Sequence, residues 1–148
     1  MNNKPLHILL ADDDEGDRLL FKLAFSELKI KTIVSTVSSG IQLMEYLNMK
    51  EVPLPYILFL DLNMPPKSGL ECLKEIKSNK NLKDVLIVIY STSDNEKDID
   101  ETFHNGANVY ITKPNDFNIL KQVLEKAVMT ASIYQEPNMI RENFLLKI

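Results

Sequence analysis

Five short apolar segments alternate with longer amphipathic ones along the chain. Four of them are rich in Ile, Val or Leu with few polar interruptions, which is typical of strands that are covered on both faces. The second contains Thr32, Ser35 and Thr36 and is predicted to be an edge strand. The predicted strands are residues 6–11, 32–37, 56–60, 85–90 and 109–111.

Between the strands, apolar residues recur at the spacing of three and four that is expected of amphipathic helices. The predicted helices are residues 16–28, 39–49, a segment that follows Gly69 and contains Leu70, Leu73 and Ile76, residues 94–104 and residues 116–129. In the first helix the expected buried side chains are Leu19, Leu20, Leu23, Ala24 and Leu28. In the second they are Ile41, Met44, Leu47 and, at its end, Met49. In the fifth they are Ile119, Leu120, Val123, Leu124 and Ala127.

The fourth helix has only Ile99 and Phe103 as apolar anchors, so we expect it to be held loosely. Strands that alternate with helices predict an α/β fold with a parallel sheet and right-handed crossovers. The expected architecture is a doubly wound five-stranded sheet in the order 2-1-3-4-5, with its ligand site beyond the carboxyl ends of the strands.

Polar side chains follow four of the predicted strands. Asp12, Asp13 and Asp14 come after the first, Asp61 and Asn63 after the third, Ser91 and Thr92 after the fourth, and Lys113 after the fifth. In the order 2-1-3-4-5 the first and third strands are neighbours. Asp12, Asp13 and Asp61 should therefore converge.

Converging carboxylates repel one another, by roughly 4 kcal/mol for two charges about 4 Å apart at an effective dielectric of about 20. Either one carboxylate binds a proton or a cation enters. A few oxygen ligands with room for water favour Mg²⁺ among Mg²⁺, Mn²⁺ and Ca²⁺. With the cation on one side and Lys113 and the Ser91 hydroxyl on the other, Asp61 is a plausible carboxylate nucleophile toward a phosphoryl group.

Each of these motifs alone has a simpler interpretation. An aspartate run after a strand commonly caps the next helix, and Asp14 with Asp17 is predicted to serve that way. Lys113 before a proline fits an exposed turn, and Ser91 with its neighbours fits a helix cap. Convergence of Asp12 and Asp13 with Asp61 and Lys113 is what favours a site.

The composition of the chain argues against several classes of protein. The chain has 148 residues, enough for one domain, with a net charge of −4 and a pI near 5.2, so a nucleic-acid partner is not expected. A single cysteine, Cys72, excludes an internal disulfide. We found no signal peptide and no apolar window long enough to span a membrane, which predicts a cytoplasmic protein without membrane contact.

Four motifs, in order and at these spacings, resemble response-regulator receiver domains, the phosphoacceptor modules of two-component signalling. The resemblance covers residues 6–129. The motifs are ILLADDD at 8–14, LDLNMPPKSG at 60–69, VIYSTS at 88–93 and NGANVYITKP at 105–114.

The resemblance implies that Asp61 is the phosphorylated residue. It implies that Asp13 ligates Mg²⁺ directly, that Asp12 acts through a metal-bound water, and that Asn63 contributes its backbone carbonyl; Mn²⁺ is a possible substitute. These roles describe a metal-dependent phosphoacceptor.

The resemblance also assigns three residues to the response. Ser91 is the switch hydroxyl, Lys113 is the family's lysine, and Tyr110 is the aromatic residue that turns inward on activation. The Lys113–Pro114 bond is expected to be cis.

A receiver of this kind catalyses its own phosphorylation from a histidine kinase or phosphotransfer protein and is not otherwise an enzyme. We expect a receiver domain over residues 1–130 and a tail over 131–148 with no output domain. The signal would then pass to a target protein through the fourth helix, fifth strand and fifth helix, or along a phosphorelay. The tail, with Pro137, Phe144, Leu145, Leu146 and Ile148, is predicted to dock on its own domain or to contact a second copy in a homodimer.

Two alternatives remain open. An aspartate-nucleophile phosphatase of the haloacid-dehalogenase type would use the Asp-x-Asp of residues 12–14 and would turn over phosphate esters steadily. A pseudo-receiver would be a binding module that carries out no chemistry. The intact Asp13, Asp61 and Lys113 argue against this alternative.

Overall fold

A five-stranded parallel sheet forms the centre of the protein in the computed structural model, which describes residues 4–133 and 141–146. The strand order is β2-β1-β3-β4-β5, as the sequence predicted. The strands are β1 (Leu6–Ala11), β2 (Thr32–Val37), β3 (Ile57–Leu60), β4 (Leu86–Ser91) and β5 (Val109–Thr112).

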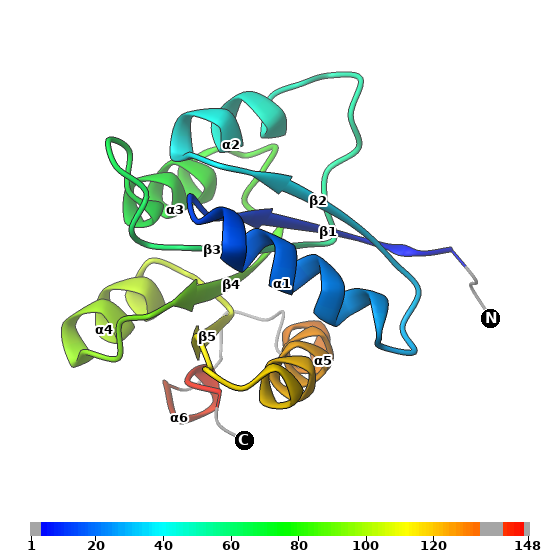
Figure 1. The fold of residues 1–148 in the computed structure, drawn as a ribbon. Coiled ribbons are helices and arrows are strands. Elements are labelled where there is room, and N and C mark those ends of the chain that lie inside the picture. The colour runs from blue at the N-terminus through cyan, green and yellow to red at the C-terminus, as the bar shows by residue number, and fades with distance from the viewer. Residues whose placement is uncertain (1–3, 134–140, 147–148) are drawn as a thin grey trace.

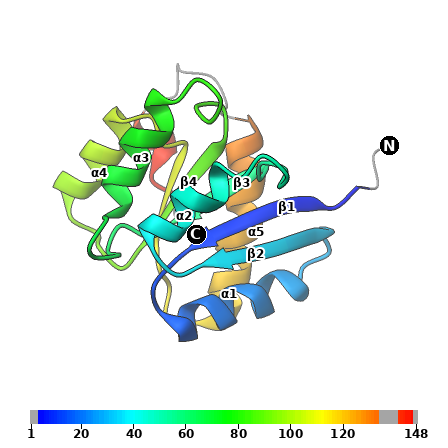
Figure 2. The same ribbon diagram turned by 90° about the horizontal axis from the view of Figure 1, so that it is seen from above.

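Helices cover both faces of the sheet (Figure 1; Figure 2 shows the same layers from above). α1 and α5 pack on one face, and α2, α3 and α4 pack on the other. No helix within the described ranges is both long and apolar enough to cross a membrane. The helices are α1 (Glu15–Ser26), α2 (Gly40–Leu47), α3 (Gly69–Ser78), α4 (Glu96–His104), α5 (Phe117–Ile133) and the short α6 (Arg141–Phe144).

Aromatic rings fill the layer between the sheet and α1. Phe21 lies 5.0 Å from both Phe25 and Phe59 and 5.7 Å from Tyr90, measured between ring centroids. Phe21 and Phe59 are fully buried, and Phe25 and Tyr90 are nearly so. This cluster connects α1 to β3 and β4 and so fixes where the loop after β1 begins.

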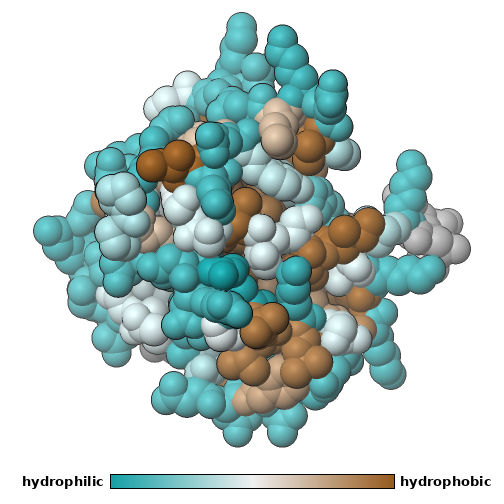
Figure 3. Space-filling view, turned by 45° about the horizontal axis from the view of Figure 1, so that its top comes forward, coloured by the Kyte–Doolittle hydropathy of each residue, from teal (hydrophilic) through white to brown (hydrophobic). Residues whose placement is uncertain are grey.

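The predicted buried face of the first helix was wrong for three of its four leucines. Leu19, Leu20 and Leu23 are 61%, 47% and 49% exposed, and apolar side chains gather in patches on the largely hydrophilic face in Figure 3. The buried stripe contains Ala24 and the partly buried Leu28, as predicted, and in place of the other leucines Phe21 and Phe25. This stripe has the i, i+3, i+4, i+7 spacing of one helix face, and its two phenylalanines bury more apolar area than the leucines would.

Smaller errors of the same kind occur in α2 and α5. Ile41 and Ile119 are 51% and 42% exposed, and Met49, just past α2, is exposed as well. Their neighbours Met44, Leu47, Leu120, Val123, Leu124 and Ala127 are buried as predicted.

The thin anchoring predicted for α4 is confirmed. Ile99 is its one buried apolar side chain, while Phe103 is partly buried. The other buried residue, Thr102, donates a hydrogen bond from its hydroxyl to the Asp98 carbonyl of its own helix. A helix with so little buried apolar area costs little free energy to shift.

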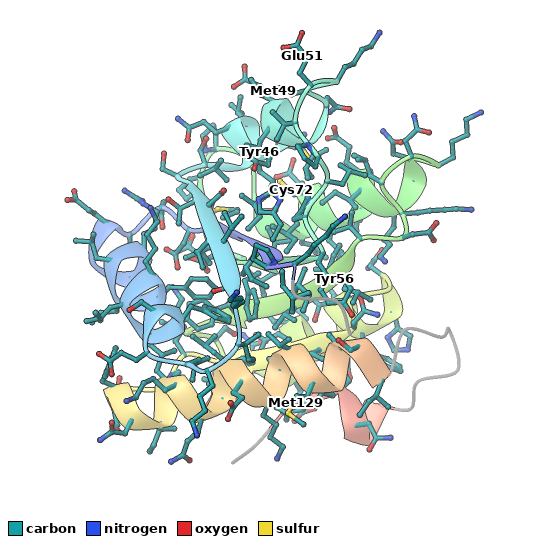
Figure 4. All side chains as sticks on the ribbon, turned by 90° about the vertical axis from the view of Figure 1, so that its right-hand side faces the viewer. Tyr46, Met49, Glu51, Tyr56, Cys72 and Met129 are labelled. Carbon is teal, nitrogen blue, oxygen red and sulfur yellow. The ribbon has the colours of Figure 1, made fainter. Side chains whose placement is uncertain are left out.

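Two residues with reactive side chains, His7 and Cys72, have structural roles. The imidazole of His7 lies 3.3 Å from the Ser35 hydroxyl and 3.1 Å from the Tyr46 hydroxyl, and Cys72 is buried in the core between α2 and α3. Figure 4 labels Tyr46 and Cys72, and also Tyr56, whose hydroxyl is hydrogen-bonded to Ser132 of α5.

The structure tests two predictions about the last third of the chain. The predicted cis bond between Lys113 and Pro114 was wrong, since the one cis peptide bond among the described residues joins Pro65 to Pro66. Trans is the lower-energy isomer even before proline. Phe144 and Leu145 of the tail contact the domain itself, as one of the two tail predictions proposed. Pro137 and Ile148 lie outside the described residues.

Candidate metal and phosphoryl site

The carboxyl ends of β1 and β3 meet at one edge of the sheet. Ala11 pairs with Leu60 in the last register position, and the Asp61 N–H donates to the Ala11 carbonyl at 3.0 Å. Asp12, Asp13 and Asp61 each place one carboxylate oxygen so that the oxygens lie within 4.8 Å of one another. The predicted convergence is confirmed.

Local hydrogen bonds shape the loop after β1. The Asp12 carboxylate accepts from the Asp14 N–H, and the Asp14 carboxylate accepts from the Asp17 N–H, each at 2.9 Å. Asp14 is therefore the N-cap of α1, as predicted. Arg18 donates to the Asp12 carbonyl at 2.9 Å, which also holds this loop. The capping interpretation applies to Asp14, while Asp12 and Asp13 face Asp61.

A close backbone contact positions Asp61. A Cβ atom on Gly69, the first residue of α3, would lie 2.1 Å from the Asp61 carbonyl oxygen, so only glycine fits there. The Gly69 N–H donates to the Leu62 carbonyl at 3.0 Å, and the Asn63 N–H donates to the Asp61 carboxylate at 3.2 Å. The part predicted for the Asn63 carbonyl, as a metal ligand, stays a prediction.

Lys113 brings the fifth strand into the site. Its ammonium lies 2.8 Å from the Asp12 carboxylate, 2.7 Å from that of Asp17 and 3.4 Å from that of Asp61. It also lies 5.2 Å from the centre of the Tyr90 ring. Such a cation is attracted to the face of an aromatic ring.

Sequence reasoning missed two of these contacts. It assigned Asp17 only to the first turn of α1, and it treated Tyr90 as an ordinary strand residue. The contact of Asp17 could have been predicted, because an acidic residue in the first turn of a helix that begins at this edge of the sheet faces the same site. The Tyr90 contact depends on how β4 and β5 pair, which the sequence does not show.

Burial and charge shift the titration of the two central groups. Burial raises the pKa of Asp61 to about 6, further raised by Asp12 and opposed by Lys113 and the Asn63 N–H. Burial disfavours the Lys113 ammonium, but its hydrogen bonds with Asp12 and Asp17 and the nearby Asp61 charge leave its pKa raised. Lys113 therefore stays charged, while Asp61 is poorly neutralised by the protein alone.

The donor set fits a hard divalent cation. Asp12 is fully buried, and its Oδ2 atom forms an ion pair with the Lys113 ammonium 2.8 Å away. Three carboxylates, of which that of Asp13 is exposed to solvent, supply the oxygen ligands that Mg²⁺ and Mn²⁺ prefer.

Ser91 and Tyr110 connect this site to the neighbouring surface. Ser91 ends β4 and is 3% exposed, and its hydroxyl accepts from the Ser93 N–H at 3.1 Å. Tyr110 is fully buried, and its hydroxyl donates to the Ser93 carbonyl at 2.8 Å. The same short loop thus contacts both predicted switch residues.

Comparison with known proteins agrees with this geometry. Residues 8–125 match the response regulator receiver domain family. Over 128 residues the chain is 31% identical to the response regulator Rcp1 of Synechocystis sp., covering 84% of this chain and 87% of Rcp1.

Two solved structures are similar to this one. The phosphorylated cyanobacterial phytochrome response regulator RcpA has a TM-score of 0.78 and 34% identity, over 84% of this chain and 91% of RcpA. The Mn²⁺-bound form of Rcp1 has a TM-score of 0.73 and 31% identity, over 87% of this chain and 91% of the other. Fold, site geometry and these matches agree that this chain belongs to the family of response regulator receiver domains.

Proposed function

We propose that this receiver accepts a phosphoryl group on the carboxylate of Asp61 in a Mg²⁺-dependent reaction and acts as a signalling switch. The observation that carries the proposal is the convergence of carboxylate oxygens from Asp12, Asp13 and Asp61, with the Lys113 ammonium 3.4 Å from Asp61 and 2.8 Å from Asp12. A buried carboxylate beside a fixed ammonium and two carboxylates that can hold a cation suits transfer of a doubly charged group.

The chain's own residues account for most of the reaction. With a pKa of about 6, Asp61 is largely ionised at neutral pH and can act as the nucleophile. Its oxygen attacks phosphorus, the P–N bond of a donor phosphohistidine breaks, and the imidazole leaves with that electron pair. Lys113 can then donate to a phosphoryl oxygen, since it carries three N–H donors.

Asp12 and Asp13 would hold the cation together with Asp61, and Asn63 would add its backbone carbonyl. When bound, Mg²⁺ supplies positive charge that offsets the charge of the phosphoryl oxygens. The similar Rcp1 structure is a Mn²⁺-bound form of that protein, which supports Mn²⁺ as a substitute here.

The response begins at Ser91. A phosphoryl oxygen that accepts a hydrogen bond from the Ser91 hydroxyl would draw that hydroxyl toward Asp61 and away from the Ser93 N–H, which now donates to it. The loop that also binds the Tyr110 hydroxyl would then shift, together with the weakly anchored α4. We propose that α4, β5 and α5 form the output surface.

We propose a cytoplasmic switch between two proteins. The donor is a histidine kinase or a histidine phosphotransfer protein, and the recipient is a target protein or a further relay component. Turnover is limited to the chain's own phosphorylation and dephosphorylation, so the protein is not an enzyme toward an external substrate.

Labelling with acetyl phosphate tests the proposal. In the presence of Mg²⁺ the wild-type chain should gain one phosphoryl group per molecule by intact-protein mass spectrometry, and Asp61→Asn should gain none. The matched control is Asp14→Asn, which makes the same charge change nearby, keeps a capping side chain and should be labelled normally. Labelled Asp61→Asn protein would remove Asp61 as the acceptor.

The same experiment separates the alternatives. Steady release of phosphate over many turnovers, lost in Asp12→Asn and kept in Asp61→Asn, would support a phosphatase with its nucleophile after β1. A wild-type chain that is not labelled by acetyl phosphate or by a phosphohistidine donor would support a pseudo-receiver.

A further inference from the structure

The outer edge of β5 is covered by the chain's own C-terminal segment. β5 is the last strand of the sheet order, so its outer edge presents backbone groups that can pair with another segment. Leu145 forms a parallel bridge with Tyr110, and the Leu146 N–H donates to the Tyr110 carbonyl at 2.9 Å. Figure 1 shows α6 beside β5.

The segment packs like a short strand. Leu145 contacts the core on the side of α2, α3 and α4, whereas Leu146 contacts the core on the side of α1 and α5. Adjacent residues on opposite sides of a sheet are the mark of a strand. The contact is therefore specific in register and direction, as in peptides that bind by strand addition.

Phe144 is the anchor of this segment. Its side chain is fully buried, with ring centroids 5.3 Å from Phe103 of α4 and 6.0 Å from Tyr110 of β5. We call Phe103, Tyr110 and the outer edge of β5 the β5 docking surface. An aromatic anchor beside backbone pairing is sufficient to define a recognition site for a short peptide.

We propose that the β5 docking surface is a peptide-binding site for a segment in which an aromatic residue ends a helical turn and is followed by two leucines that lie along β5, and that residues 144–146 of this chain are its resident ligand. A partner that uses this surface must displace that segment. The proposal concerns binding alone and does not depend on phosphorylation of Asp61.

Chain connectivity favours this intramolecular ligand. α5 ends at Ile133, so only residues 134–143, which include the start of α6 at Arg141, separate α5 from residues 144–146. A short connection gives an effective concentration on the order of millimolar. A free peptide at micromolar concentration therefore competes poorly while the segment is bound.

Competition by a synthetic peptide tests the proposal with full-length protein. The probe is a fluorescent peptide with the sequence of residues 141–148, and its binding is measured by fluorescence anisotropy. Phe144→Ala removes the anchor of the resident segment, so this variant should bind the probe at least tenfold more tightly than the wild type does. Ile133→Ala, an apolar deletion at a side chain that is 70% exposed, should bind it as the wild type does. A probe peptide that carries Phe144→Ala should not bind.

Three results would overturn the proposal. Equal affinity of the probe for the wild type and Phe144→Ala is one. A wild-type dimer by sedimentation that becomes a monomer in Phe144→Ala is the second, because the segment would then be exchanged between two copies. The third is free hydrogen exchange at the Leu146 amide of the wild type, where we expect at least tenfold protection relative to the peptide. This last measurement does not require that Phe144→Ala folds.

Discussion

Two residues near the end of β3, Phe59 and Asp61, are both buried and have opposite energetic roles. Phe59 is fully buried among Phe21, Phe25 and Tyr90, so its burial stabilises the fold. Asp61 is 5% exposed beside two other carboxylates and has a raised pKa, so burying its charge destabilises the fold. Phe59 belongs to the structural core, and Asp61, two positions further along the chain, belongs to the site.

The difference shows what the aromatic layer contributes to function. Close packing under the sheet edge holds the loops that carry Asp12, Asp13 and Asp61 in place although their charges repel. Lys113 offsets part of that repulsion, and a bound cation would offset more. Substitutions in the two regions should therefore change stability in opposite directions.

The largest effect is expected in the core. Phe59→Ala should lower the free energy of unfolding by about 3–5 kcal/mol, because it leaves a cavity among the three remaining rings. Urea denaturation followed by circular dichroism measures this change. Leu20→Ala, which removes an apolar side chain that is 47% exposed, is the control and should change stability far less. Similar losses for both variants would contradict the assignment of the α1 core stripe.

The opposite sign is expected at Asp61. The pKa of Asp61 is raised in the folded protein from 3.8 to about 6, so its contribution to stability is complete below pH 4 and is lost as the pH rises through 6. In EDTA, Asp61→Asn should be more stable than the wild type by up to about 3 kcal/mol above pH 7 and equal to it near pH 4. A difference that does not vary with pH would show that the Asp61 charge is not the cause.

Binding of Mg²⁺ should offset part of the destabilisation that the buried Asp61 charge causes. At ten times its dissociation constant, Mg²⁺ should raise the free energy of unfolding of the wild type by roughly 1.4 kcal/mol at pH 7. Thermal unfolding with and without Mg²⁺ measures the gain. Asp13→Asn should lose most of it, whereas Asp14→Asn should keep it. An equal gain in both variants would place the cation elsewhere.

The smallest effect is expected at Asp14, and it tests whether this capping residue is separate from the metal site. Asp14→Ala removes the N-cap of α1 and should cost about 1 kcal/mol, whereas Asp14→Asn should cost only a few tenths. Both variants should bind Mg²⁺ as the wild type does. Weakened Mg²⁺ binding in either would extend the metal site to Asp14.

Much of the fold could be predicted from local patterns. Apolar runs located all five strands, and the alternation with helices predicted the parallel sheet and its order. Spacing alone could not choose between competing apolar faces of α1, because Leu19, Leu20 and Leu23 compete with Phe21 and Phe25 for burial. The choice depends on Phe59 and Tyr90, which come from distant strands.

The sequence by itself determined which residues follow the strands, and hence that Asp12, Asp13, Asp61 and Lys113 meet at one edge. Parallel strands and short connections leave these residues no other place. Only the tertiary structure decided that Asp17 shares Lys113, that Tyr90 lies beneath it and that Phe144 covers Tyr110. Each of these contacts joins segments far apart in the chain, and their side-chain geometry is set by packing, for which local sequence carries no signal.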